Sequence, residues 1–290
     1  MTTPAEAPLE APVIPYVDPH RRARSKARSR RDALIASVST VVVFAILGYL
    51  VTASPGWPKV QETFFNLDEA VAAWPTLIKA FVLNIKIFLV AEFFILILSL
   101  LIALGRGLRA PVALPVRIMC TVYVDFFRGV PTILVILLLG FGVPALQLKG
   151  VTNSPVVWGT VALILSYTAY VAEVYRAGIE SIHPSQRAAA RSLGLSSMQT
   201  TRYVVLPQAV RRVIPPLLND FIALQKETAL VSLLGPIEVL RSAQINASAN
   251  FNYTAYVVAA LLFVAITLPL TRLTDWLQRR DTRRRMAGAM

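Results

Sequence analysis

The sequence alternates between long apolar stretches and shorter polar segments. Several stretches reach the roughly 20 residues that an α-helix needs to cross a bilayer. A transmembrane β-barrel would instead alternate apolar and polar positions over strands of about ten residues, and this chain does not. The pattern predicts an all-α polytopic membrane protein with six spans, at residues 33–51, 76–104, 116–141, 156–174, 213–234 and 253–273.

These spans divide the chain into a short N-terminal part and a five-span core. Residues 1–32 form a tail rich in Pro, Ala and Glu that ends in a basic run, and we expect it to be disordered. The first span, 33–52, could also be read as a signal peptide, but its apolar run is longer than such peptides usually have. We expect an uncleaved helix there, followed by an outer segment at 53–75, the core at 76–273 and a basic tail at 274–290.

Composition and charge support this assignment. The 290 residues are 56% hydrophobic and 16% charged, whereas a soluble domain carries about 25% charged residues. The net charge is +13, and 22 of the 29 Lys and Arg residues fall in four basic blocks that alternate with the apolar spans. This is the pattern of cytoplasmic loops under the positive-inside rule, so we expect both termini in the cytoplasm and no nucleic acid as a partner.

The sequence offers few residues for metal or acid–base chemistry. Its single cysteine, Cys120, cannot form an internal disulfide or a cysteine-based metal site. The two histidines, His20 and His183, each lie in a basic flank. We therefore predict neither a catalytic residue nor a metal site.

Charged residues inside the third span mark a candidate hinge. Asp125 and Arg128 are three residues apart, so they share a helix face and could pair. Gly129 and Pro131 follow, and should bend or break the helix. The pattern fits either a hinge or pore element, or a charge pair that only fixes helix packing.

The fifth span carries a candidate translocation path. Asn219 and Asp220 precede Lys226 and Glu227 by seven residues, nearly two helical turns, so we expect one polar stripe that Thr228 continues. Such a stripe must face other helices or water, so it lines either a path or a helix interface. Glu173, one turn before Arg176, is a further path candidate or a simple surface pair.

The basic loop at about 176–212 lies between two spans and resembles a docking surface. Pro184 should open a helix and Gly194 should end it, Ser196 or Ser197 should cap a second short helix, and Pro207 should limit that second helix. Three alanines offer a low surface into which a partner can pack closely. The candidate docking residues are Gln186, Ala188, Ala189, Ala190, Arg191, Gly194, Leu206 and Pro207.

The spacing in this loop resembles the signature of ABC-transporter permease subunits. That signature is Glu-Ala-Ala, three residues, Gly, nine residues and Ile-x-Leu-Pro, and the same slots here hold Ala188-Ala189-Ala190, Gly194, Val204 and Leu206-Pro207. The chain is also similar to the polar amino acid branch, typified by histidine and glutamine permeases. The matching stretches are Phe127–Pro131, Ala169–Glu173, Leu206–Ala209 and Lys226–Ser232.

Three positions depart from the pattern. Ala188 stands where the signature has an acidic residue, so any salt bridge from that slot is lost. Glu227 and Ala229 replace residues that are commonly Asp and Ser in this branch.

The resemblance implies the membrane subunit of an importer of polar amino acids in the bacterial inner membrane. The five-span permease core would be joined by one extra N-terminal span. The implied partners are an ATPase subunit that grips the loop, a second permease subunit that is identical or different, and an extracytoplasmic binding protein. The chain itself has no Gly-x-x-x-x-Gly-Lys-Ser/Thr phosphate loop, so ATP and Mg would be bound by the ATPase and not by this chain.

Two other functions remain open from the sequence. An ion-coupled secondary transporter or channel would use the intramembrane charges but leaves the basic loop without a role. A polytopic membrane enzyme would usually place acidic or histidine clusters at the interface, whereas the inner loops here are basic.

Overall fold

The computed structural model describes the backbone of residues 19–108 and 110–287, and side-chain environments for residues 31–108 and 110–280. The described residues are helical and contain no strand, which confirms the expected fold class. The chain divides into two compact units, residues 1–60 and 61–290. Residues 1–18, which we expected to be disordered, lie outside the described residues.

The first unit contains one long helix, α1 (Pro19–Thr52). This helix begins before the expected start at residue 33, so the prediction of a disordered tail is wrong for residues 19–32. The helix includes the basic run, because Arg, Ala and Lys favour the helix. All its described side chains from residue 31 onward are exposed. The stretch Arg31–Thr52 is apolar and long enough to cross a membrane.

The second unit begins with a long helix. The boundary between the two units falls within the short helix α2 (Trp57–Phe64), and the long helix is α3 (Leu67–Gly107). The side chain of Asn66 caps α3 by accepting from the amides of Asp68 and Glu69, at 3.0 and 3.3 Å. This cap starts α3 earlier than the expected residue 76. The helix therefore takes up part of the segment that we had placed outside the bilayer.

The third expected span is broken. A short helical turn, η1 (Pro111–Ala113), leads into α4 (Leu114–Gly129), and α5 (Thr132–Ala145) follows after two residues. The two helices meet at an angle of 103°. Val130 is extended between them, because a residue before proline disfavours the helical conformation. The break at Gly129 and Pro131 is as predicted.

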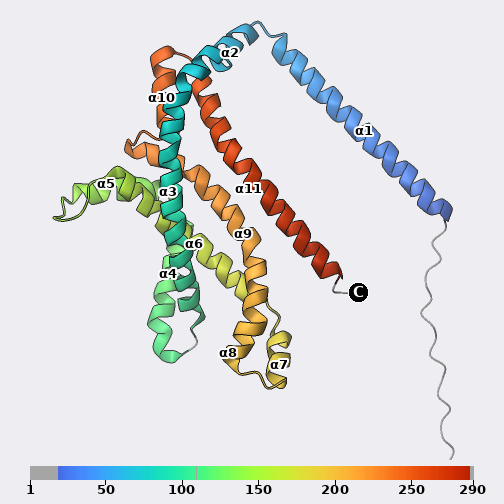
Figure 1. Cartoon of the computed structure of the whole chain (residues 1–290), viewed down its shortest axis with the longest axis vertical. Helices are drawn as coiled ribbons and strands as arrows, with labels where there is room; N and C mark the ends of the chain where they lie inside the picture. Colours follow the sequence, from blue (N-terminus) through green and yellow to red (C-terminus); the bar gives the residue numbers. More distant parts are fainter. Residues whose placement is uncertain (1–18, 109, 288–290) are drawn as a thin grey trace, which may run out of the picture. The chain divides into compact units, whose positions relative to one another are not determined.

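The remaining helices complete the unit. They are α6 (Pro155–Glu180), α7 (Pro184–Ser192), α8 (Ser197–Gln199), η2 (Thr200–Val205), α9 (Leu206–Glu227), η3 (Thr228–Leu234), α10 (Val239–Asn250) and α11 (Thr254–Ala287). Within this unit, α7 and α8 lie at the end that also carries the junction between α3 and α4, whereas α10 lies at the opposite end (Figure 1). The C-terminal tail that we separated at residue 274 continues α11 as helix.

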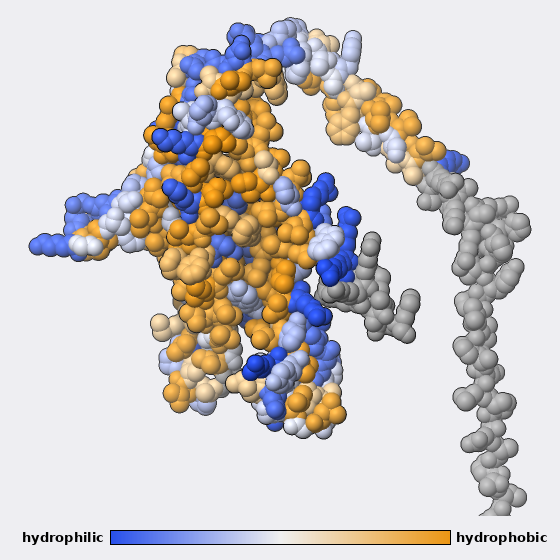
Figure 2. Space-filling model, viewed as in Figure 1, coloured by the Kyte–Doolittle hydropathy of each residue, from blue (hydrophilic) through white to orange (hydrophobic). Residues whose placement is uncertain are grey.

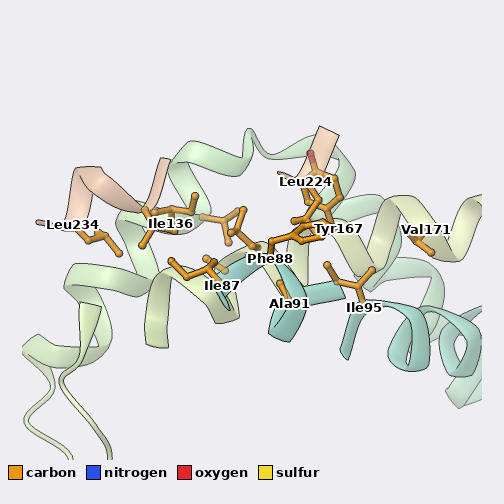
Figure 3. Close-up of a cluster of buried hydrophobic side chains, with 13 residues drawn as sticks. Ile87, Phe88, Ala91, Ile95, Ile136, Tyr167, Val171, Leu224 and Leu234 are labelled. Carbon is orange, nitrogen blue, oxygen red and sulfur yellow. The ribbon is translucent and has the colours of Figure 1, made fainter. Parts of the chain in front are cut away.

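Two hydrophobic clusters hold the second unit together. The larger joins α3, α5, α6, α9 and η3, and includes Ile87, Phe88, Ile136, Tyr167 and Leu224 (Figure 3). The smaller joins α3, α10 and α11 through alanines, valines, Leu77, Phe81 and Leu262. Outside these clusters, Figure 2 shows a broad hydrophobic surface over the middle of the unit, as expected for helices that face lipid or another membrane subunit.

Length and composition identify four membrane-crossing helices among the described residues, or five if the bent pair α4 and α5 counts as one span. We had expected six spans, and α9 is the one that does not qualify. It carries five charged residues: Arg211, Arg212, Asp220, Lys226 and Glu227. Because α9 packs against α6 and α11, part of its surface is covered by protein and need not be apolar.

Candidate functional site

The first helix of the basic loop forms as the sequence predicts. α7 begins at Pro184, where a missing N–H costs nothing, and the His183 side chain accepts from the amide of Ser185. Gly194 follows the helix with φ +84°. That left-handed conformation is one that glycine adopts without penalty, so Gly194 ends the helix and turns the chain.

The second loop helix is capped as expected but does not end as expected. Ser196 and Gln199 form a reciprocal capping box at the start of α8. The helix then passes through the π-helical turn η2 directly into α9. Pro207 does not limit it, because Pro207 lies in the first turn of α9, where proline is tolerated. One helical element therefore runs from the loop to Glu227.

The exposed side chains of α7 form a small, low surface. Gln186, Ala188, Ala189 and Arg191 are exposed. Ala190 is buried, as α7 packs against η2. The three alanines are therefore split, with two available to a partner and one supporting the loop.

Two apolar residues that we did not single out from the sequence border this surface. Leu193 is 84% exposed and Met198 is 76% exposed, on either side of Gly194. Large apolar side chains in a polar loop were a signal available from the sequence. Leu206 and Pro207, at the start of α9, are also exposed. We call the exposed residues of α7, together with Leu193 and Met198, the loop surface.

The expected polar stripe of α9 is split into three environments. Successive residues on a helix are about 100° apart, so among these four residues only the pairs seven apart, Asn219 with Lys226 and Asp220 with Glu227, share a face. Asn219 and Lys226 are exposed, whereas Asp220 and Glu227 are partly buried on the adjacent face. Thr228 is fully buried and accepts a hydrogen bond from Asn84 at 3.2 Å. The prediction of one continuous stripe was wrong.

The two acidic residues of α9 are incompletely paired. Asp220 Oδ2 and Glu227 Oε2 are buried, and neither has a hydrogen-bond partner among the described residues. A buried carboxylate oxygen without a partner is costly, so such atoms often mark a place where something else binds.

The predicted pair at the hinge does not form. Asp125 and Arg128 are both exposed, and no ion pair joins them in the described part of the chain. The helix break at residues 129–131 lies directly after Arg128, so the Arg128 side chain need not lie on the same helix face as Asp125. The charge-pair interpretation is therefore wrong, while the helix break is real.

Arg128 instead lines a cavity of about 400 Å³ with Asp220. α4, α6 and α9 all contribute to it, and the cavity brings together residues that we assigned to separate candidate groups. Tyr170 and Arg212, which we did not single out, also line it. Besides Arg128 and Asp220, the lining residues are Tyr170, Glu173, Val174, Ala177, Gly178, Ser181, Arg212 and Pro216.

Glu173 is held in an ion-pair network at the edge of this cavity. Its carboxylate pairs with Arg106 of α3 at 2.7 Å and with Arg176 of α6. Arg176 also pairs with Glu180. The network ties the end of α3 to α6 and occupies the carboxylate of Glu173, so this residue is a structural element of the bundle.

The described residues contain no group of three or more His, Cys, Asp or Glu side chains arranged to hold a metal ion. The candidate functional site consists of three parts. These are an exposed loop surface, a continuous helix that leads from it, and a cavity with charges of both signs.

Known proteins with similar sequences are membrane permeases. The chain is 33% identical over 210 residues to "Probable amino-acid permease protein YxeN" of Bacillus subtilis (strain 168), which covers 72% of this chain and 92% of that protein. It is 34% identical over 176 residues to "Probable glutamine ABC transporter permease protein GlnM" of the same organism, covering 60% of this chain and 79% of that protein.

Solved structures of ABC transporters contain chains with a similar fold. The structure described as "Crystal structure of an amino acid ABC transporter with histidines" has a TM-score of 0.66 and 32% identity, and the match covers 72% of this chain and 96% of that one. The MetNI methionine ABC transporter, at 19% identity and a TM-score of 0.56, shares the fold, over 70% of this chain and 95% of that one.

The match to a family extends over most of the second unit. Residues 114–284 match the family described as "Binding-protein-dependent transport system inner membrane component". These residues include the broken span, the loop, α9 and the cavity-lining helices. The chain therefore belongs to the family of inner membrane components of binding-protein-dependent transport systems.

Proposed function

We propose that this chain carries amino acids across the bacterial inner membrane as one permease subunit of an ATP-driven importer. The proposal rests on the loop surface joined through a continuous helix to a cavity with both signs of charge. The printed names of the relatives, which are amino-acid and glutamine permeases, support amino acids as the substrate class. The family description supports a binding protein that delivers the substrate.

The loop surface is the proposed docking site for the ATPase. Ala188 and Ala189 allow a partner to approach the helix backbone closely, and Leu193 and Met198 supply apolar area beside them. Burying an exposed leucine or methionine contributes roughly 1.5–3 kcal/mol. With Ala188 in the slot that is usually acidic, these apolar contacts and the arginines carry the interaction.

Movement of the docked loop would reach the cavity through one continuous helical element. α8, η2 and α9 follow one another without an interruption, from Ser197 to Glu227. A displacement of the loop by the ATPase therefore moves the segment that carries Asp220. Coupling by rigid-body shifts of packed helices is a common way to transmit such changes.

The cavity suits a zwitterion. Arg128 offers a guanidinium for the substrate carboxylate, and Asp220 offers a carboxylate oxygen without a hydrogen-bond partner among the described residues for the substrate ammonium. Glu173 already pairs with two arginines, so we assign substrate contact to Arg128 and Asp220 and not to Glu173. The orientation with both termini in the cytoplasm and a second permease subunit complete the proposal.

Co-purification of the ATPase subunit and uptake of labelled amino acids test this function. Ala189→Trp should abolish co-purification of the ATPase and ATP-dependent uptake in vesicles, because the bulky ring prevents close approach. Ala249→Trp, at an exposed position of α10 at the opposite end of the unit, is the matched control and should keep the ATPase bound. Normal ATPase retention by Ala189→Trp would overturn the docking assignment. Uptake that follows an ion gradient without ATP would support a secondary transporter instead.

A further inference from the structure

An arginine-lined cleft lies between the loop and the ends of α3, α4 and α6. Its volume is about 970 Å³, and it is separate from the cavity that holds Arg128 and Asp220. Four helices each contribute at least one arginine to it. These arginines are Arg106, Arg117, Arg176, Arg187 and Arg191.

The acidic residues nearby neutralise only two of these five arginines, Arg106 and Arg176. Glu180 is the one carboxylate in the cleft lining, and it pairs with Arg176. Glu173 pairs with Arg106 and again with Arg176. The cleft therefore keeps an excess of positive charge.

Two of the arginines have no partner within the part of the chain that the structure describes. The side chains of Arg117 and Arg191 are exposed and make no hydrogen bond or ion pair with any described residue. Arg187 donates to the carbonyl of Ile179 at 3.0 Å, but its Nε is buried without a partner among the described residues. Guanidinium groups are well suited to bind phosphate oxygens through paired N–H donors. The cleft thus has the chemistry of a phosphate site.

An apolar surface continues from the cleft along α4. A second cavity of about 380 Å³ shares Arg106, Arg117, Arg176 and Glu180 with the cleft, and its other lining residues all belong to α4. Ile118 and Val122 line this second cavity and are 52% and 60% exposed. A ligand that fills both cavities must be anionic at one end and apolar at the other.

We propose that this cleft binds the headgroup of an anionic phospholipid, with the acyl chains lying along α4. A basic pocket between transmembrane helices at the cytoplasmic face is a recognised form of binding site for anionic headgroups. A free phosphate would satisfy the arginines but would leave the apolar surface of α4 uncovered. The headgroup would also bridge α4 and α7, and so connect the loop surface to the lipid. The proposal rests on the membrane location and orientation proposed above, but not on the substrate.

Lipid retention by the purified complex tests the proposal. The full chain, purified with its accompanying subunits, is reconstituted in nanodiscs of phosphatidylcholine that contain a minor fraction of phosphatidylglycerol. Lipid that stays with the protein after transfer to detergent is then quantified. Each basic residue near an anionic surface contributes about fivefold in affinity, so Arg117→Gln should lower the retention of phosphatidylglycerol about fivefold. Arg117→Lys should keep most of it.

The control variant removes one positive charge elsewhere. Arg272 of α11 is exposed and lies in the last basic block, which the positive-inside pattern puts at the same membrane face. Arg272→Gln should retain phosphatidylglycerol like the wild type. Equal retention by the wild type and Arg117→Gln would overturn the proposal. So would equal retention of phosphatidylcholine and phosphatidylglycerol, or displacement of the lipid by millimolar inorganic phosphate. ATP-dependent uptake by Arg117→Gln is measured in parallel. If the variant still transports amino acids but retains lipid like the wild type, the lipid site is wrong while the proposed function stands.

Discussion

The side-chain amide of Asn84 donates a hydrogen bond of 2.9 Å to the carboxylate of Glu238, and both side chains are buried. Asn84 lies within α3, whereas Glu238 caps α10 by accepting from the amides of Leu240 and Arg241 at 3.0 and 2.8 Å. Burial raises the pKa of the Glu238 carboxyl, while the hydrogen bonds from the Leu240 amide and from Asn84 act to lower it. Asn84 therefore stabilises a buried group that the bundle alone would not tolerate.

Replacing Asn84 should destabilise the protein strongly. Asn84→Leu keeps the size of the side chain but removes the donor to Glu238 and Thr228, and the acceptor for the Val239 amide. A buried polar group left without its partner costs about 1–3 kcal/mol, and more when it is charged. We expect a clear drop in the melting temperature of the purified protein.

The control for this experiment is Asn246→Leu. The Asn246 side chain donates to the Ser242 carbonyl within its own helix and reaches no other element. Its replacement should change the melting temperature little. If both variants melt alike, the connection between α3 and α10 does not depend on Asn84.

Gly178 allows α6 and α9 to approach closely. A Cβ at this position would fall inside the van der Waals distance of the Val213 side chain and lie 3.6 Å from the Ala209 carbonyl oxygen. Gly178→Ala should therefore lower the stability by about 1–3 kcal/mol, as overpacking typically does. Thermal melting of the purified protein measures this effect.

A second substitution tests the cause. Val213→Ala makes room for the new methyl group, so the double variant should be more stable than the sum of the single effects predicts. Gly142→Ala is the matched control, because no atom lies within 4 Å of a Cβ there. It should leave stability unchanged or raise it by up to about 1 kcal/mol. Additive effects of the Gly178 and Val213 changes would rule out the contact as the cause.

Local signals in the sequence predicted several elements correctly. The helix start at Pro184, the glycine turn at Gly194 and the break at Pro131 each depend on the backbone preferences of one or two residues. The helical type of the spans also followed from apolar length, but their number did not, because four helices qualify, or five with the bent pair α4 and α5, against the six expected. α6 and α11 pack against α9 and cover part of its surface, which the sequence does not show, whereas Asn219 and Lys226 stay exposed.

The candidate site was predictable only in part, because it depends on distant contacts. Helical spacing allowed Arg128 to pair with Asp125 or to serve a hinge or pore element, and in the structure it lines a cavity that α6 and α9 complete. Glu173 was expected to line the path or to pair with Arg176, and the structure shows the pair and adds Arg106, which is 67 residues away in the sequence. Thr228 was expected beside Lys226 but turns into the buried contact with Asn84. Such relationships follow from helix packing and not from periodicity.

Gly194 should be required for its backbone conformation and not for space. Nothing lies within 4 Å of a Cβ added there, but φ is +84°. Valine in this conformation costs about 1–2 kcal/mol or more, whereas asparagine tolerates it. Gly194→Val should therefore reduce ATPase co-purification and uptake while leaving membrane insertion intact, and Gly194→Asn should retain both. Equal loss in the two variants would indicate that the glycine acts in another way.

Arg128 and Asp220 should determine substrate affinity, whereas Lys226 should not. If the two cavity residues hold the carboxylate and ammonium of an amino acid, Arg128→Gln and Asp220→Asn each remove a charged hydrogen bond worth about 1.5–3 kcal/mol. We expect the KM for uptake to rise about tenfold or more in each, with little change in the melting temperature. Lys226 is exposed and does not line the cavity, so Lys226→Met should transport normally. Uptake in vesicles and melting of the purified complex, measured together, distinguish a path through this cavity from a path along the face of α9 that carries Asn219 and Lys226. If Lys226→Met alone strongly lost uptake, the substrate path would lie along the face of α9 that carries Asn219 and Lys226, and the cavity would not be part of the transport route.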